Sequence, residues 1–120
     1  MHALTASVLL ATGALAAHTP RQACPPLHIF GARETTAPPG MGTAGASVNA
    51  SAQAHPGATS EAIDYPACGG QGQCGGVPYE QSAQQGTQAT ATAVNSFHEQ
   101  CPDAEIVLIG YSQVRSVRRP

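Results

Sequence analysis

A four-residue aliphatic run leads directly into Gly-Tyr-Ser, and this serine is the residue best placed to do chemistry. The run is 106–109 and the serine is Ser112. A short apolar run of this kind is typical of a buried parallel strand. Gly110 stands two residues before the serine, where a backbone without a Cβ can turn sharply and expose the hydroxyl. The pattern predicts a nucleophile at a strand end, although Val114 stands where a second glycine is expected.

A serine nucleophile needs a general base and an acid that orients the base. In hydrolases with this strand-turn arrangement, the acid and the histidine both follow the serine in the sequence. No aspartate, glutamate or histidine follows Ser112, and His28, His55 and His98 all precede it. His28 lies in a predicted buried strand and His98 near a helix end, and we interpret each as structural or solvated rather than catalytic. The triad is therefore expected to be incomplete in these residues.

Two further motifs do not indicate a cofactor or a metal. Residues 70–75 fit the G-x-G-x-x-G pattern of dinucleotide-binding loops, but a cysteine lies within them and a disulfide-closed turn is the better interpretation. Cys68 and Cys74 lack the spacing and the nearby histidines of a zinc site. Asn49 begins a glycosylation sequon, which would modify the surface without a role in activity. We predict neither a cofactor nor a metal.

The start of the chain predicts secretion to the extracellular space. Residues 3–17 are mostly apolar and end in small residues, so we expect a signal peptide at 1–17 and a short pro-segment at 18–22. A transmembrane helix is the alternative, but the run is short and interrupted by polar residues. The formal net charge of −2 does not indicate a nucleic-acid or membrane partner.

The last residues differ in composition from the rest. The chain has no lysine, and three of its arginines are Arg115, Arg118 and Arg119. We interpret residues 114–120 as an atypical tail that arises from a truncated or misread reading frame. A basic tail that recruits a partner is the alternative.

The four cysteines favour two disulfides in a secreted chain. Three pairings are possible. The short glycine-rich segment between Cys68 and Cys74 favours a local bond, which leaves Cys24 to pair with Cys101. Closing that long loop would stabilise the fold by about 4–5 kcal/mol in the chain-entropy model. Such a contribution is expected in a small domain with few large core residues and no tryptophan.

Hydrophobic periodicity predicts an alternation of strands and helices. Strands are expected at 27–31, 61–66 and 106–109, and helices at 46–54 and 79–101. This order predicts right-handed crossovers and a parallel sheet with helices on both faces.

Four longer blocks extend the pattern around Ser112 to most of the chain. They are CPPLHIFGARETT (24–36), IDYPACGG (63–70), VNSF (94–97) and IVLIGYSQ (106–113). Together they resemble the fungal acetylxylan esterases of the cutinase-like carbohydrate esterase family. The resemblance identifies 23–113 as the N-terminal part of such an esterase domain.

The resemblance implies an α/β fold, a three-layer α/β/α sandwich around a central parallel sheet of about five strands. It also implies ester hydrolysis by a Ser-Asp-His triad, with removal of acetyl groups from xylan. Ser112 matches the nucleophile of the family. Thr35 and Gln113 match its oxyanion-hole positions, whose donors stabilise the negative oxygen that develops during the reaction. The implied disulfide pairing agrees with the one above.

Family members continue after the residue equivalent to Gln113 with Gly-Gly and then the rest of the sheet, the aspartate and the histidine. We therefore interpret the chain as an inactive fragment, monomeric if folded, of an enzyme that acts on acetylated xylan or another ester. Residues 106–109 would then lie at an exposed sheet edge. The alternatives are a fragment of a cutinase-type polyester hydrolase and a disulfide-bonded carbohydrate-binding protein without catalysis. The scarcity of aromatic residues argues against the second.

Overall fold

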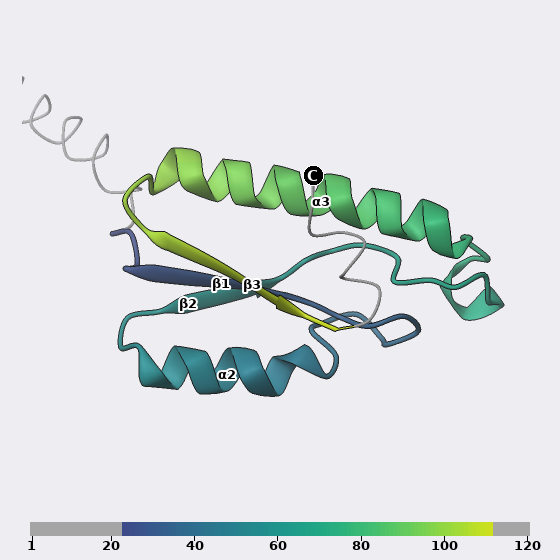
Figure 1. Ribbon diagram of the computed structural model, residues 1–120, viewed down its shortest axis with the longest axis horizontal. Helices are drawn as coiled ribbons and strands as arrows, with labels where there is room; N and C mark the ends of the chain where they lie inside the picture. The colour runs from purple at the N-terminus through teal and green to yellow at the C-terminus, as the bar shows by residue number, and fades with distance from the viewer. Residues whose placement is uncertain (1–22, 112–120) are drawn as a thin grey trace, which may run out of the picture.

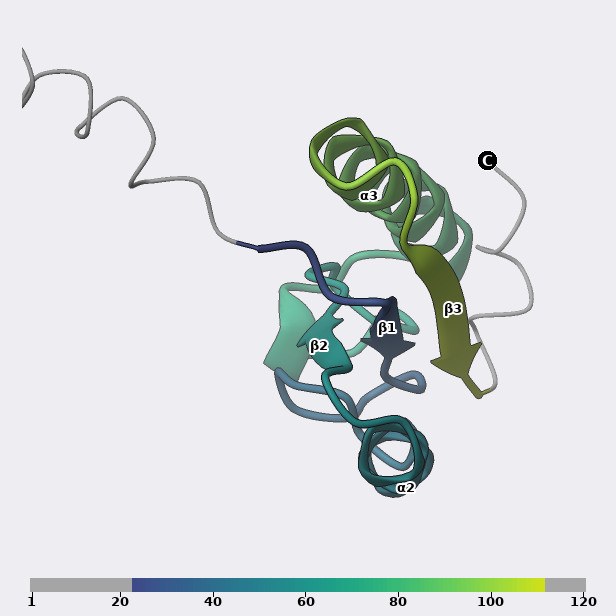
Figure 2. The same cartoon turned by 90° about the vertical axis from the view of Figure 1, so that its left-hand side faces the viewer.

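The computed structural model describes residues 23–111, which form a parallel sheet between two helices (Figure 1). The elements are β1 (Leu27–Ala32), α2 (Ala44–Ala54), β2 (Thr59–Ala62), η1 (Gly72–Cys74), α3 (Tyr79–Gln100) and β3 (Glu105–Gly110). The strand order is β2-β1-β3, with both pairs parallel. Figure 2 shows α2 on one face of the sheet and α3 on the other. The predicted α/β class with helices on both faces is confirmed.

Strand β1 is the centre of the structure, because all of its residues are buried. Successive side chains of a strand point to opposite faces. Phe30 accordingly belongs to the core cluster under α3, together with Ile63 and Tyr65. Ile29 belongs to a smaller cluster under α2, where it packs with Val48. The central strand therefore holds both layers of the sandwich together.

The second predicted strand was placed too late in the sequence. We expected residues 61–66, and β2 is Thr59–Ala62. Ile63 still donates a backbone hydrogen bond to Gly31 O (2.8 Å), but the chain then leaves the sheet. Ile63 and Tyr65 are apolar because they pack in the core cluster, not because they continue the ladder. The first predicted helix also begins two residues earlier than expected, at Ala44.

His28 is a structural residue, as predicted. Its Nδ1 lies 2.6 Å from Thr59 Oγ1, and its Nε2 lies 3.0 Å from Glu61 Oε1. Its ring stacks on Phe97 of α3 with the ring centres 4.2 Å apart. Both nitrogens and one ring face are therefore engaged in joining β1 to β2 and α3.

Both disulfides have the predicted pairing. Cys24 bonds to Cys101 with the Cα atoms 5.6 Å apart, and Cys68 bonds to Cys74 with the Cα atoms 5.7 Å apart. The first joins the segment before β1 to the residue after α3. The second closes the loop that contains η1, which confirms the interpretation of residues 70–75 as a disulfide-closed turn.

Strand β3 is an edge strand of the described sheet, and Val107 on it is 40% exposed. None of the helices in the described part of the chain is long and apolar enough to cross a membrane. Several predictions lie outside the described residues: the signal peptide at 1–17, the pro-segment at 18–22, the pair Ser112 and Gln113, and the tail at 114–120.

Candidate active site

The carboxyl ends of the three parallel strands lie at the same edge of the sheet. The register pairs Gly31 with Ala62 across β1 and β2, and Ala32 with Gly110 across β1 and β3. The chain therefore leaves all three strands at nearly the same level. Open parallel sheets bind ligands at this edge.

The predicted oxyanion-hole and nucleophile segments both start at this edge. Thr35 follows Ala32 by three residues, and Ser112 follows Gly110 by two. The strand ends that precede these two segments, Ala32 of β1 and Gly110 of β3, therefore lie side by side. Ser112 and Gln113 lie outside the described residues, so their roles and the sharp turn at Ser112 stay predictions.

Thr35 lies in the turn that follows β1, close to the disulfide loop. A Cβ built on Gly69 would lie 3.2 Å from Thr35 Cγ2. Such a distance is tighter than ordinary van der Waals contact, so a side chain at position 69 would press on Thr35. Because Gly69 has no side chain, the disulfide loop can lie close to the Thr35 turn.

Two non-glycine residues beside this turn have a left-handed backbone. The φ angles are 74° at Thr36 and 50° at Ala67. Thr36 N donates a hydrogen bond to Ala67 O at 2.7 Å, which joins the loop after β1 to the loop after β2. Such residues cost about 1–3 kcal/mol each and gather at functional sites. The surrounding contacts must therefore hold both loops in place.

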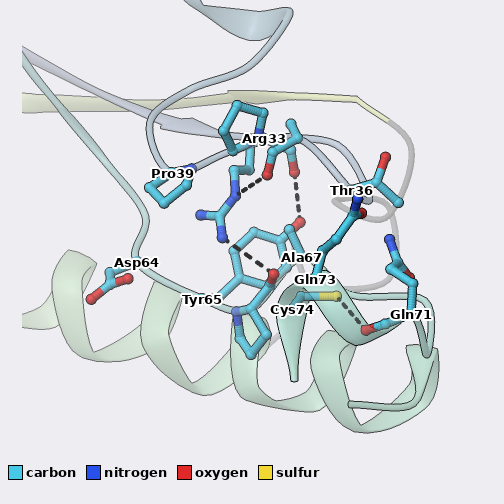
Figure 3. Close-up of a pocket in the computed structure, with 12 residues that line it drawn as sticks. Arg33, Thr36, Pro39, Asp64, Tyr65, Ala67, Gln71, Gln73 and Cys74 are labelled. Carbon is cyan, nitrogen blue, oxygen red and sulfur yellow. Dashed lines mark hydrogen bonds between the residues drawn. The ribbon is translucent and has the colours of Figure 1, made fainter. Parts of the chain in front are cut away.

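Arg33 and Tyr65 provide those contacts (Figure 3). Arg33 is only 6% exposed, and its Nε donates to Ala37 O (2.9 Å) while its Nη2 donates to Pro66 O (3.2 Å). The Tyr65 hydroxyl donates to Arg33 O at 2.6 Å. Desolvation by burial raises the pKa of Tyr65 to about 12, although the Arg33 charge opposes the rise. The hydroxyl therefore remains a protonated donor at neutral pH.

Glu34 fixes the other end of the loop after β1. Its carboxylate accepts hydrogen bonds from Thr43 N (2.9 Å) and Thr43 Oγ1 (2.6 Å), immediately before α2. These bonds favour the ionised form and lower the pKa of Glu34, with the hydroxyl bond the largest cause. The turn that carries Thr35 is thus held on both sides.

We expect Glu34→Gln to make the stability of the fold less sensitive to acid. Because the pKa of Glu34 is lower in the folded chain than in the unfolded chain, its stabilising effect is complete above the ordinary carboxyl pKa and is lost as pH falls through the lowered value. The variant should unfold at a lower temperature than the parent at neutral pH. Between about pH 5 and about pH 3, the unfolding temperature of the variant should fall by less than that of the parent. Melting curves followed by circular dichroism measure both quantities.

Glu99→Gln is the matched control, because Glu99 is an exposed residue of α3 with no hydrogen bond to its side chain within the described chain. It should keep the acid sensitivity of the parent. Equal acid sensitivity in the Glu34→Gln and Glu99→Gln variants would contradict the role assigned to Glu34.

The described histidines lie at the opposite edge of the sheet. His28 is the second residue of β1, His55 follows α2 just before β2, and His98 is in the last turn of α3, just before β3. At about 3.3 Å per residue, His28 is about 13 Å from the end of its strand. His55 Nδ1 also lies 2.8 Å from Ser51 O. None of the three is therefore placed to act as the base for a serine that follows β3.

No group of three or more His, Cys, Asp or Glu that could hold a metal ion occurs among residues 23–111. Sequence reasoning did not single out Arg33 or Tyr65 as residues that shape this edge. Their only signal was membership of the blocks at 24–36 and 63–70.

Comparison with known proteins identifies the family. A family model described as Cutinase matches residues 23–118. The chain belongs to the cutinase family. It is 58% identical over 112 residues to Cutinase 11 of Verticillium dahliae and 51% identical over 116 residues to an acetylxylan esterase of Hypocrea jecorina. Each alignment covers 91% of this chain and 38% of the relative.

Solved structures agree with this family. The catalytic core domain of acetyl xylan esterase from Trichoderma reesei is 58% identical, with a TM-score of 0.74 over 76% of this chain and 44% of that one. A cutinase-like protein from Cryptococcus sp., at 24% identity and a TM-score of 0.57, shares the fold. The predicted resemblance to cutinase-like acetylxylan esterases is confirmed. This chain spans less than half the length of these relatives.

Proposed function

We propose that this chain is the nucleophile-bearing part of a secreted serine esterase that removes acetyl groups from xylan. The register that pairs Ala32 with Gly110 is the observation that carries the proposal. The Thr35 turn follows the first of these strand ends in the sequence, and Ser112 follows the second. Acetylxylan esterases among the relatives support the substrate. The two disulfides support an oxidising compartment outside the cell.

In the proposed reaction, the Ser112 hydroxyl oxygen attacks the carbonyl carbon of the acetyl ester and its proton passes to a base. The carbonyl oxygen gains negative charge, and donors at Thr35 and Gln113 stabilise it. The sugar hydroxyl leaves with a proton, and water then releases acetate from the serine. The described histidines lie at the other sheet edge, and no histidine follows Ser112. We therefore propose that a polypeptide of these 120 residues does not catalyse the reaction by itself.

The first experiment compares the 120-residue polypeptide with its Ser112→Ala variant on p-nitrophenyl acetate. We expect equal rates, because a serine without a base remains a weak neutral nucleophile. A rate in the parent that disappears in the variant would show that these residues are sufficient for catalysis.

The second experiment tests the proposed roles in a chimera. The residues after Gln113 are replaced by the corresponding carboxyl-terminal part of the Hypocrea jecorina acetylxylan esterase, of which this chain covers 38%. We expect the chimera to release acetate from acetylated xylan and Ser112→Ala to abolish the release. Thr35→Val, which removes a hydroxyl donor at nearly constant shape, should lower kcat by about 10²–10³-fold. Thr35→Ser should retain most of the activity.

A folded chimera without Ser112-dependent hydrolysis would overturn the proposal. Polyester hydrolysis of the cutinase type is the second candidate, since one relative at 58% identity is named a cutinase. Faster hydrolysis of cutin and of p-nitrophenyl esters with longer acyl chains than of acetylated xylan would favour that function.

A further inference from the structure

A pocket of about 770 Å³ lies at the carboxyl edge of the sheet, and the roles proposed above do not use it. Three segments contribute to its wall: 33–39 after β1, 64–67 after β2, and 71–74 of the disulfide loop (Figure 3). Its volume is within the range of about 300–1,000 Å³ typical of small-molecule sites. Thr36 is part of the wall, so the pocket adjoins the Thr35 turn.

The most buried polar group of the pocket is the Arg33 guanidinium. Two backbone carbonyls hold its Nε and Nη2 atoms, and Tyr65 lies with its ring centre 5.5 Å from the guanidinium carbon. Its Nη1 atom makes no hydrogen bond within residues 23–111, and the side chain has no ion pair there. Buried arginines are usually paired. The remaining N–H groups of Arg33 are therefore fixed donors without a protein partner in this region.

The pocket wall also carries side chains that can accept hydrogen bonds. The Asp64 carboxylate and the Gln73 amide are exposed, and neither makes a hydrogen bond within the described part of the chain. In Figure 3, Asp64 lies on the opposite side of Tyr65 from Gln73. Pro38 and Pro39 add apolar surface to the wall. The pocket thus combines one cation, one carboxylate and neutral amides with apolar patches.

We infer that this pocket is a saccharide subsite, which binds a neutral sugar residue of the polysaccharide whose ester is presented to Ser112. Sugar hydroxyl groups both donate and accept hydrogen bonds, so a neutral sugar can donate to the Asp64 carboxylate and accept from the Arg33 guanidinium. An anionic ligand would gain one cation but would also face the Asp64 carboxylate. The position of the ester rests on the proposed function, whereas binding of the sugar itself does not require Ser112.

The experiment titrates the ¹⁵N-labelled 120-residue chain, carrying Ser112→Ala, with xylotriose. We expect amide shifts to change at residues of the pocket wall, including Asp64 and Gln73. Asp64→Asn keeps an acceptor oxygen but removes its charge, so it should raise the Kd several-fold, as expected when a charge-assisted hydrogen bond becomes a neutral one. Gln73→Ala should raise the Kd several-fold.

Matched controls lie on the surface outside the pocket. Asp103→Asn and Gln84→Ala change the same side-chain types at exposed positions and should leave the Kd unchanged. Absence of shifts with xylotriose, or equal effects of the pocket and control variants, would overturn the inference. Tighter binding of glucuronate than of xylotriose would also overturn it, because it would identify an anion site.

The outcomes separate this inference from the proposed function. Saccharide binding with an inactive, folded chimera would support the subsite and contradict the esterase. Ser112-dependent hydrolysis by the chimera without saccharide binding at the pocket would contradict the subsite alone.

Discussion

Replacing Cys24 and Cys101 together by serine is expected to lower the free energy of unfolding by about 4–5 kcal/mol, because their bond closes a long loop in the unfolded chain. The two cysteines are 77 positions apart. The bond also lies where β3 joins the sheet, since Glu105 N donates a hydrogen bond to Pro26 O at 3.0 Å. Small domains have a total stability of about 5–15 kcal/mol. The expected loss is therefore between about a third and nearly all of the total stability.

The matched control replaces Cys68 and Cys74 by serine. These residues are 6 positions apart, so the same model predicts a smaller loss of about 2–2.5 kcal/mol. Urea unfolding of both variants without a reducing agent, followed by circular dichroism, gives the two free energies. A larger loss from the short loop than from the long one would contradict the loop-closure explanation.

Local sequence patterns were sufficient for most elements of the fold. The aliphatic runs at β1 and β3 and the helical spacing of α3 identified those elements to within one or two residues. The boundary of β2 was misplaced because burial and strand pairing leave the same apolar signal. Ile63 and Tyr65 are buried at 2% and 4% exposure, yet they pack beyond the end of the ladder.

The candidate site was predictable only where a residue pattern carries the chemistry. Ser112 follows from the strand-Gly-x-Ser pattern, and Thr35 and Gln113 from the resemblance. The contacts of Arg33 with Ala37 and Pro66 could not be inferred, because an arginine that binds backbone carbonyls has no sequence signature. The left-handed backbone at Thr36 was equally hidden, since such a backbone normally favours glycine.

Phe30→Ala is expected to lower the free energy of unfolding by about 3–5 kcal/mol, the usual loss when a buried aromatic ring is removed. Phe30 is fully buried at 0% exposure, and its ring centre lies 4.7 Å from that of His28 and 6.4 Å from that of Phe97. The residues of α3 that pack against this cluster include the small residues Ala89 and Ala93. These short side chains cannot extend to fill the cavity, so we expect little relaxation.

Two further substitutions separate the cavity effect from a general loss of aromatic area. Phe97 is only partly buried, so Phe97→Ala should cost less than Phe30→Ala. Tyr79 is 42% exposed, and Tyr79→Ala should cost about 0.5 kcal/mol or less. Urea unfolding gives all three values. Equal losses at Phe30 and Tyr79 would contradict the central place assigned to β1. The expected order means instead that the strand leading to the Thr35 turn is fixed from beneath by Phe30, so that the geometry of the candidate site depends on this ring.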